Sequence, residues 1–192
     1  MHLIGADVRA GGHTLVELLI VLTIMGVVAA LARPLSEPVR PFRAEAAAKD
    51  VAQALRFAQA EAQRTGAYLL VKCDIAANSV TLSRLDLGAN PPAPDPAIPV
   101  LHPLDKRGYK LVFDKSPSTS GVTLAGCAFT FDDGKTAAQL IFGADGAPVN
   151  VVGNKHGDVR ALVGSGAITL ATGQLVRTVT VAAANGRVSL SP

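Results

Sequence analysis

Side chains that could do chemistry are few in this sequence, and their spacing matches no catalytic or metal-binding pattern. The histidines and cysteines are scattered, at His2, His13, His102, His156, Cys73 and Cys127. Motifs that gather such groups do not occur, among them H-E-x-x-H, C-x-x-C, G-x-S-x-G and the phosphate-binding glycine loop. Aspartates precede glycines at 133 and 145 without the spacing of a calcium loop. We therefore expect no enzyme activity, no cofactor and no metal site.

One carboxylate stands where a charge is costly. Residues 12–32 read GHTLVELLIVLTIMGVVAALA, and from residue 15 onward they are apolar apart from Glu17 and Thr23. A helix over residues 15–32 would cover about 27 Å, close to the ~30 Å of bilayer hydrocarbon. A carboxylate inside such a span costs about 2.5 to 3.5 kcal/mol. The sequence therefore predicts a transmembrane helix in which Glu17 has a partner and a function.

The residues at the start of this helix resemble a known processing signal. Gly12, followed by HTLVE and a long apolar stretch, resembles the signal of type IV prepilins and type II secretion pseudopilins. The resemblance implies that prepilin peptidase cuts after Gly12 and that the new N-terminus, His13, is methylated. It also implies that Glu17, the fifth mature residue, pairs with the terminal amine of a neighbouring subunit during fibre assembly. The family usually has phenylalanine where this chain has His13.

Two other interpretations of this segment stay open. A secretory signal peptide would end in small residues, and Ala30, Leu31 and Ala32 before Arg33 supply such a cut site. Its apolar core would then be long and would contain a glutamate. An ordinary membrane anchor would explain the apolar length and leave the arrangement of residues 12–17 as a coincidence.

The charges that flank the apolar segment favour the opposite orientation from the resemblance. Arg9 precedes the segment, whereas Arg33, Arg40 and Arg43 follow it. By the positive-inside rule alone, the following chain would lie in the cytoplasm. The resemblance implies instead a single-pass inner-membrane protein with its C-terminal body in the periplasm, and we adopt that orientation.

Composition allows one anchor and one body domain. The chain has 192 residues, is 49% hydrophobic and has no tryptophan, so small and aliphatic side chains must fill its core. A net charge of +3 is too small to indicate nucleic acid by itself. If the body is periplasmic, Cys73 and Cys127 face an oxidising compartment, where they form either a disulfide or two separate thiols.

The pattern after the apolar segment predicts an α+β fold. Prolines at 34, 38 and 41 predict a kink, placed at Pro34, and residues 43–65 have the period of an amphipathic helix capped by Gly66. Alternating strand and turn signals predict antiparallel hairpins in two small sheets, with the long pilin-like helix packed on them. The expected strands are 67–73, 80–85, 109–113, 122–124, 128–131, 138–142, 167–171, 176–181 and 188–190.

These signals divide the chain into four segments. They are a leader (1–12), a transmembrane and fibre-core helix (13–32), a proline kink with an amphipathic helix (33–66) and a periplasmic β-rich body (67–192). Within the body, six prolines make residues 86–108 an irregular, exposed loop. This loop is either a partner contact or a tolerated insertion.

The last third of the chain resembles the GspH/FimT group of minor pseudopilins and minor pilins. In that group a strand ends in an F-x-x-x-G turn and a final hairpin closes at a glycine, matched here by Phe142, Gly146, Thr169, Gly173, Val179 and Gly186. The resemblance implies a minor pseudopilin of the GspH type, near the tip of a type II secretion pseudopilus and active in protein export across the outer membrane. Its partners would be other pseudopilins in a hetero-oligomeric fibre, prepilin peptidase, the inner membrane and secreted substrates.

Two further functions remain as alternatives. A FimT-like type IV minor pilin would bind DNA during uptake, through the basic residues Lys155, His156, Arg160, Arg177 and Arg187. That branch would have a second arginine two residues after Arg187, where this chain has Ser189, so we expect no nucleic-acid partner. The other alternative is a periplasmic binding domain released by signal peptidase after Ala32.

Overall fold

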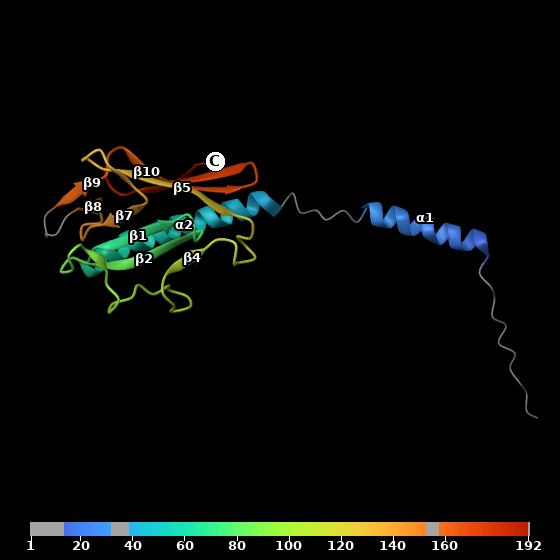
Figure 1. Ribbon diagram of the computed structural model, residues 1–192, viewed down its shortest axis with the longest axis horizontal. Helices are drawn as coiled ribbons and strands as arrows, with labels where there is room; N and C mark the ends of the chain where they lie inside the picture. Colours follow the sequence, from blue (N-terminus) through green and yellow to red (C-terminus); the bar gives the residue numbers. More distant parts are fainter. Residues whose placement is uncertain (1–13, 32–38, 153–157, 192) are drawn as a thin grey trace, which may run out of the picture. The chain divides into compact units, whose positions relative to one another are not determined.

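The computed structural model describes residues 14–31, 39–152 and 158–191. They belong to two units, residues 1–36 and 37–192, each of which is described by itself (Figure 1). Several predicted features fall outside the described residues: the cut between Gly12 and His13, the kink at Pro34, and Lys155 and His156.

The first unit contains helix α1 (Leu15–Leu31). It forms within the apolar segment predicted to be helical, and Glu17 lies in its first turn. Its described side chains, from Leu15 to Ala29, are all exposed. In the part of the chain that the structure describes, no helix has both the length and the apolar content needed to cross a membrane.

The second unit begins with helix α2 (Val39–Thr65), which starts earlier than the predicted residue 43. Pro41 is accommodated because it lies in the first turn, where backbone N–H groups have no acceptor within the helix. The helix ends at Gly66, whose φ of 65° is the left-handed conformation that caps helices. Alanines such as Ala58, which is fully buried, dominate the inner face and let the backbone approach the sheets closely.

Two antiparallel sheets follow α2. The seven-stranded sheet has the order β3-β2-β1-β7-β8-β9, with β4 paired to β2. Its strands are β1 (Leu69–Asp74), β2 (Ser79–Asp86), β3 (Ala93–Pro94), β4 (Lys110–Val112), β7 (Gln139–Phe142), β8 (Pro148–Val151) and β9 (Val159–Ala161). The five-stranded sheet has the order β12-β11-β10-β5-β6. Its strands are β5 (Thr123–Thr130), β6 (Thr136–Ala137), β10 (Ser165–Thr172), β11 (Leu175–Ala182) and β12 (Val188–Ser191).

A single hydrophobic cluster joins α2 to both sheets. It includes Leu55 from α2, Leu140 and Phe142 from the seven-stranded sheet, and Ile168 and Val179 from the five-stranded sheet. Along its length α2 contacts β1 of one sheet and β10, β11 and β12 of the other (Figure 1). The predicted α+β fold, with a helix packed on two antiparallel sheets, is confirmed. The helix that packs on them is α2.

Strand boundaries differ from the sequence pattern where pairing is non-local. Residues 122–124 and 128–131, predicted as two strands, belong largely to one strand, β5, which pairs with β10 across a register shift. The pattern does not predict the short strands β3, β6, β8 and β9. The loop 86–108 is also less irregular than predicted, since β3 pairs with β2 and Leu101 bridges Gly108.

Candidate functional site

The N-terminus of α1 is held by a threonine cap. The Thr14 Oγ1 accepts the Glu17 N–H at 3.3 Å, and the Thr14 carbonyl oxygen accepts the Leu18 N–H at 3.2 Å. Thr14 is therefore the N-cap residue, and Glu17 occupies the N3 position of the S/T-x-x-E capping pattern. A carboxylate in the first turn also interacts favourably with the helix dipole. The role of Thr14 is not among the features predicted above, although the Thr-x-x-Glu spacing signals it.

Apart from Glu17 and Thr23, the surface of α1 is apolar on all sides. Its large hydrophobic side chains range in exposure from 49% at Val21 to 82% at Leu15. The hydroxyl of Thr23 donates back to the Leu19 and Ile20 carbonyl oxygens, at 2.8 Å each, so this polar group is satisfied within the helix. A helix that is hydrophobic all round belongs in a protein core or a membrane. Within the described part of the first unit, no other element covers α1.

The N-terminal segment matches a known motif. Residues 8–32 match the family described as a prokaryotic N-terminal methylation motif. This match confirms the prediction of a prepilin-type motif and contains Gly12, His13 and Glu17, whose individual roles stay predictions. The family covers only this segment of the chain. No curated protein matches the sequence.

Solved structures with some similarity to this chain include minor pseudopilins and minor pilins. One structure of EpsH, a minor pseudopilin of the Vibrio cholerae type II secretion system, is 19% identical over 78% of this chain and 96% of that chain, with a TM-score of 0.46. A second EpsH structure is 15% identical over 78% and 95%, with a TM-score of 0.48. The Pseudomonas aeruginosa type IV minor pilin FimU is 15% identical over 78% and 88%, with a TM-score of 0.45. Similarity this weak carries no argument about function.

The basic residues considered for DNA contact lie on different sheets. Arg160 is on β9, where its guanidinium is 3.0 Å from Asp158. Arg177 is on β11 and reaches Glu45 of α2 at 3.3 Å. Arg187 is exposed next to β12. The structure therefore pairs two of these charges within the chain and does not place the three on one strand or one sheet.

Cys73 and Cys127 are joined by a disulfide, with Sγ atoms 2.10 Å apart and Cα atoms 6.4 Å apart. Cys73 lies on β1 and Cys127 on β5, so the bond links the two sheets. Disulfides form and persist in oxidising compartments. The bond therefore fits a body that lies outside the cytoplasm.

The glycines of the C-terminal pattern meet α2 at two β-turns. The Gln59 Nε2 donates to the Gly146 carbonyl oxygen at 3.0 Å and to the Asn185 carbonyl oxygen at 2.9 Å. Both Gly146 (φ 80°) and Gly186 (φ 66°) have left-handed backbone, and a side chain at Gly186 would collide with Gln59. The pattern thus brings a turn of each sheet to the same helix. Gln59 is a second residue whose role the sequence does not reveal.

Two carboxylates of α2 have pKa values shifted in opposite directions. Glu61 accepts hydrogen bonds from Arg64 at 2.8 and 2.6 Å, and these lower its pKa against the opposing effect of partial burial. Burial raises the pKa of Asp50, and the nearby His102 opposes that shift. Burial and the charge of Asp50 raise the pKa of Tyr109, whose ring lies 4.7 Å from that of His102. The loop 86–108 therefore returns to α2 beside a half-buried carboxylate.

Proposed function

We propose that the chain is a minor pseudopilin of the GspH type, a structural subunit near the tip of a type II secretion pseudopilus. In this role it takes part in protein export across the outer membrane. The observation that carries the proposal is the methylation motif at residues 8–32, joined to a helix that is apolar on every side. Before assembly, lipid of the inner membrane covers α1, and the body lies in the periplasm. After assembly, the helices of other pseudopilins cover it.

The N-terminus of the mature chain would explain why a carboxylate is kept inside this apolar helix. A cut after Gly12 leaves one residue ahead of the Thr14 cap, so the new amine lies at the positive end of the helix dipole. Methylation keeps the charge of that amine. A carboxylate in the first turn of its own or a neighbouring subunit would offset this charge, and we propose that Glu17 has this role. Pairing also lowers the cost of holding Glu17 in an apolar environment.

We favour protein export over DNA uptake because two of the basic residues considered for DNA contact form ion pairs within the chain. The Glu45 and Asp158 carboxylates already pair with Arg177 and Arg160, so these arginines are poorly suited to attract phosphates. A periplasmic domain released after Ala32 is disfavoured because such a cut would remove the whole motif at residues 8–32.

Processing is tested by mass spectrometry of the full chain extracted from membranes after co-expression with prepilin peptidase. We expect an N-terminus at His13 that carries one added methyl group. A Gly12→Asp variant serves as the uncut control. An N-terminus at Arg33 would reject the proposal and support release by signal peptidase.

Assembly is tested with Glu17 variants in a host that has the secretion system. We expect Glu17→Ala and the isosteric Glu17→Gln to stay in the membrane but to be lost from sheared fibres, because both lack the charge. Thr14→Ala is the matched control, since it removes the cap and keeps the carboxylate. Fibre incorporation of Glu17→Gln at the wild-type level would contradict the pairing role.

The choice of system is tested by deletion of the gene in a host with both a type II secretion system and type IV pili. We expect loss of enzyme release into the medium and unchanged DNA uptake. Unchanged secretion with reduced DNA uptake would instead assign the FimT-like role.

A further inference from the structure

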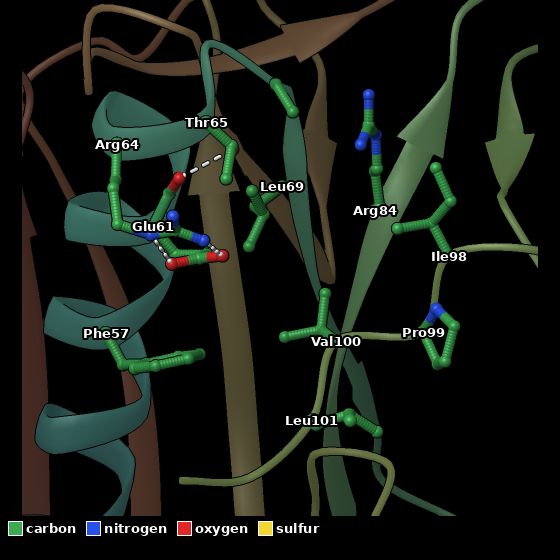
Figure 2. A pocket seen from close by; sticks show the side chains of 11 residues that line it. Phe57, Glu61, Arg64, Thr65, Leu69, Arg84, Ile98, Pro99, Val100 and Leu101 are labelled. Carbon is green, nitrogen blue, oxygen red and sulfur yellow. Dashed lines mark hydrogen bonds and ion pairs between the residues drawn. The ribbon is translucent and has the colours of Figure 1, made fainter.

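A groove lies between the C-terminal half of α2 and the loop 86–108. It has a volume of about 320 Å³. Figure 2 shows Phe57, Glu61 and Arg64 on the helix side and Arg84, Ile98 and Leu101 on the opposite side. Ile98 and Leu101 are 48% and 44% exposed, so the loop side of the groove presents two large apolar side chains to solvent. Every lining residue belongs to the second unit.

The loop that forms one wall is anchored, so the groove exists before anything binds. Val100 is partly buried against the core, and its carbonyl oxygen accepts the Tyr109 N–H at 2.8 Å. The Tyr109 ring contacts those of Phe57 and His102, with centroid distances of 5.2 and 4.7 Å. A preformed groove binds with little loss of conformational entropy.

The charges around the groove are unbalanced. Arg64 and Glu61 neutralise each other through two hydrogen bonds. Arg84 is half-buried, and within the described residues it has no ion-pair partner. A buried or half-buried guanidinium gains most from a carboxylate, which it can bind with two parallel hydrogen bonds. The groove therefore offers one unpaired cation beside an apolar surface.

A second hollow shares part of its lining with the groove. Arg84 and Ala67 line both hollows, and the second is also lined by Asp86 and Asp95. These two carboxylates each accept a backbone N–H at 2.8 Å, from Gly88 and Ala97. An extended chain can therefore pass over Arg84, with an apolar side chain on one side and a polar or basic one on the other.

We propose that this groove binds a segment of another protein in which a large apolar side chain stands next to an aspartate or glutamate. The apolar side chain lies between Phe57 and Leu101, and the carboxylate pairs with Arg84. The site belongs to the second unit alone, so it does not depend on the proposed role of α1 in a fibre. It gives the loop 86–108 the role of a partner contact.

The test is a selection of randomised heptapeptides, displayed on phage between fixed glycine and serine residues, against the full chain in detergent micelles. Empty micelles remove peptides that bind detergent. The enriched peptide is then made with blocked ends, and its affinity is measured by fluorescence polarisation. The test variants are Arg84→Gln and Ile98→Asp. The control variant is Arg187→Gln, which removes one arginine charge at an exposed position outside the groove. Far-UV circular dichroism checks that each variant is folded.

We expect enrichment of an apolar residue followed by Asp or Glu. Loss of the charge-assisted pair should weaken binding to Arg84→Gln at least about tenfold. Ile98→Asp should bind as weakly, and Arg187→Gln should bind like the wild type. The proposal is overturned if no acidic and apolar class is enriched, or if Arg84→Gln binds the enriched peptide as tightly as the wild type. An equal loss in Arg187→Gln would also overturn it, because binding would then reflect net charge alone.

Discussion

Loss of the Cys73–Cys127 bond should cost the second unit a large part of its stability. The bond closes a loop with a sequence separation of 54. For a loop of this length, the chain-entropy relation gives about 14 cal/mol/K, or about 4 kcal/mol at 25 °C. With a urea m-value of about 2 kcal/mol/M, the unfolding midpoint should fall by roughly 2 M. Both sheets should be destabilised, because the bond joins β1 to β5.

The assay is urea unfolding of the full chain in detergent, with and without a phosphine reductant. Reduction should lower the midpoint of the wild type and leave that of a Cys73→Ala/Cys127→Ala variant unchanged. The reduced wild type and this variant should then unfold at similar urea concentrations. If reductant does not move the wild-type midpoint, the bond contributes no stability and the argument from loop closure is wrong. A free-thiol titration of the unfolded wild type without reductant shows whether the bond is present.

Two more predictions concern single side chains of the second unit. Gly166→Ala should cost about 1 to 3 kcal/mol, because its Cβ would overlap the buried ring of Phe129, whereas the nearest atom to a Cβ at Gly126 is 3.7 Å away. Calorimetry should therefore show a lower Tm for Gly166→Ala than for Gly126→Ala, and equal values would contradict the packing. The raised pKa of Asp50 means that stability is lost as pH rises from 3.8 through the folded-state value. The Asp50→Asn variant should thus be more stable than the wild type at pH 7. The urea midpoints of the variant and the wild type should converge below pH 3.8. A difference between the two midpoints that widens on acidification would refute this.

Local signals explain the features that the sequence predicts well. The helix over residues 15–31 follows from a run that is apolar except at Glu17 and Thr23, and the end of α2 follows from Gly66. The hairpin of β10 and β11 follows from alternation on both sides of Gly173. Each of these depends on residues close together in the chain, so periodicity and turn chemistry suffice to predict it.

The features that the sequence leaves open all depend on contacts between distant residues. The pairing of β1 with β7 and of β5 with β10 brings together strands that are far apart in the chain. The ion pair of Arg177 with Glu45 follows from where α2 lies on β11, and it removes a charge that the sequence suggests is available. The groove beside Arg84 has the same origin, because α2 and the loop 86–108 meet only in the folded chain.

The apolar residues of this chain fall into two groups, the buried core of the second unit and the exposed surface of α1. Mutations can therefore distinguish a role in folding from a role in assembly. The core of the second unit is complete within itself, since the buried cluster draws on α2 and both sheets. A change in α1 such as Glu17→Ala should therefore leave the unfolding of the second unit unchanged while it alters what α1 can pack against. A defect in fibre incorporation without a shift in Tm is the signature that distinguishes a role in assembly from a role in folding.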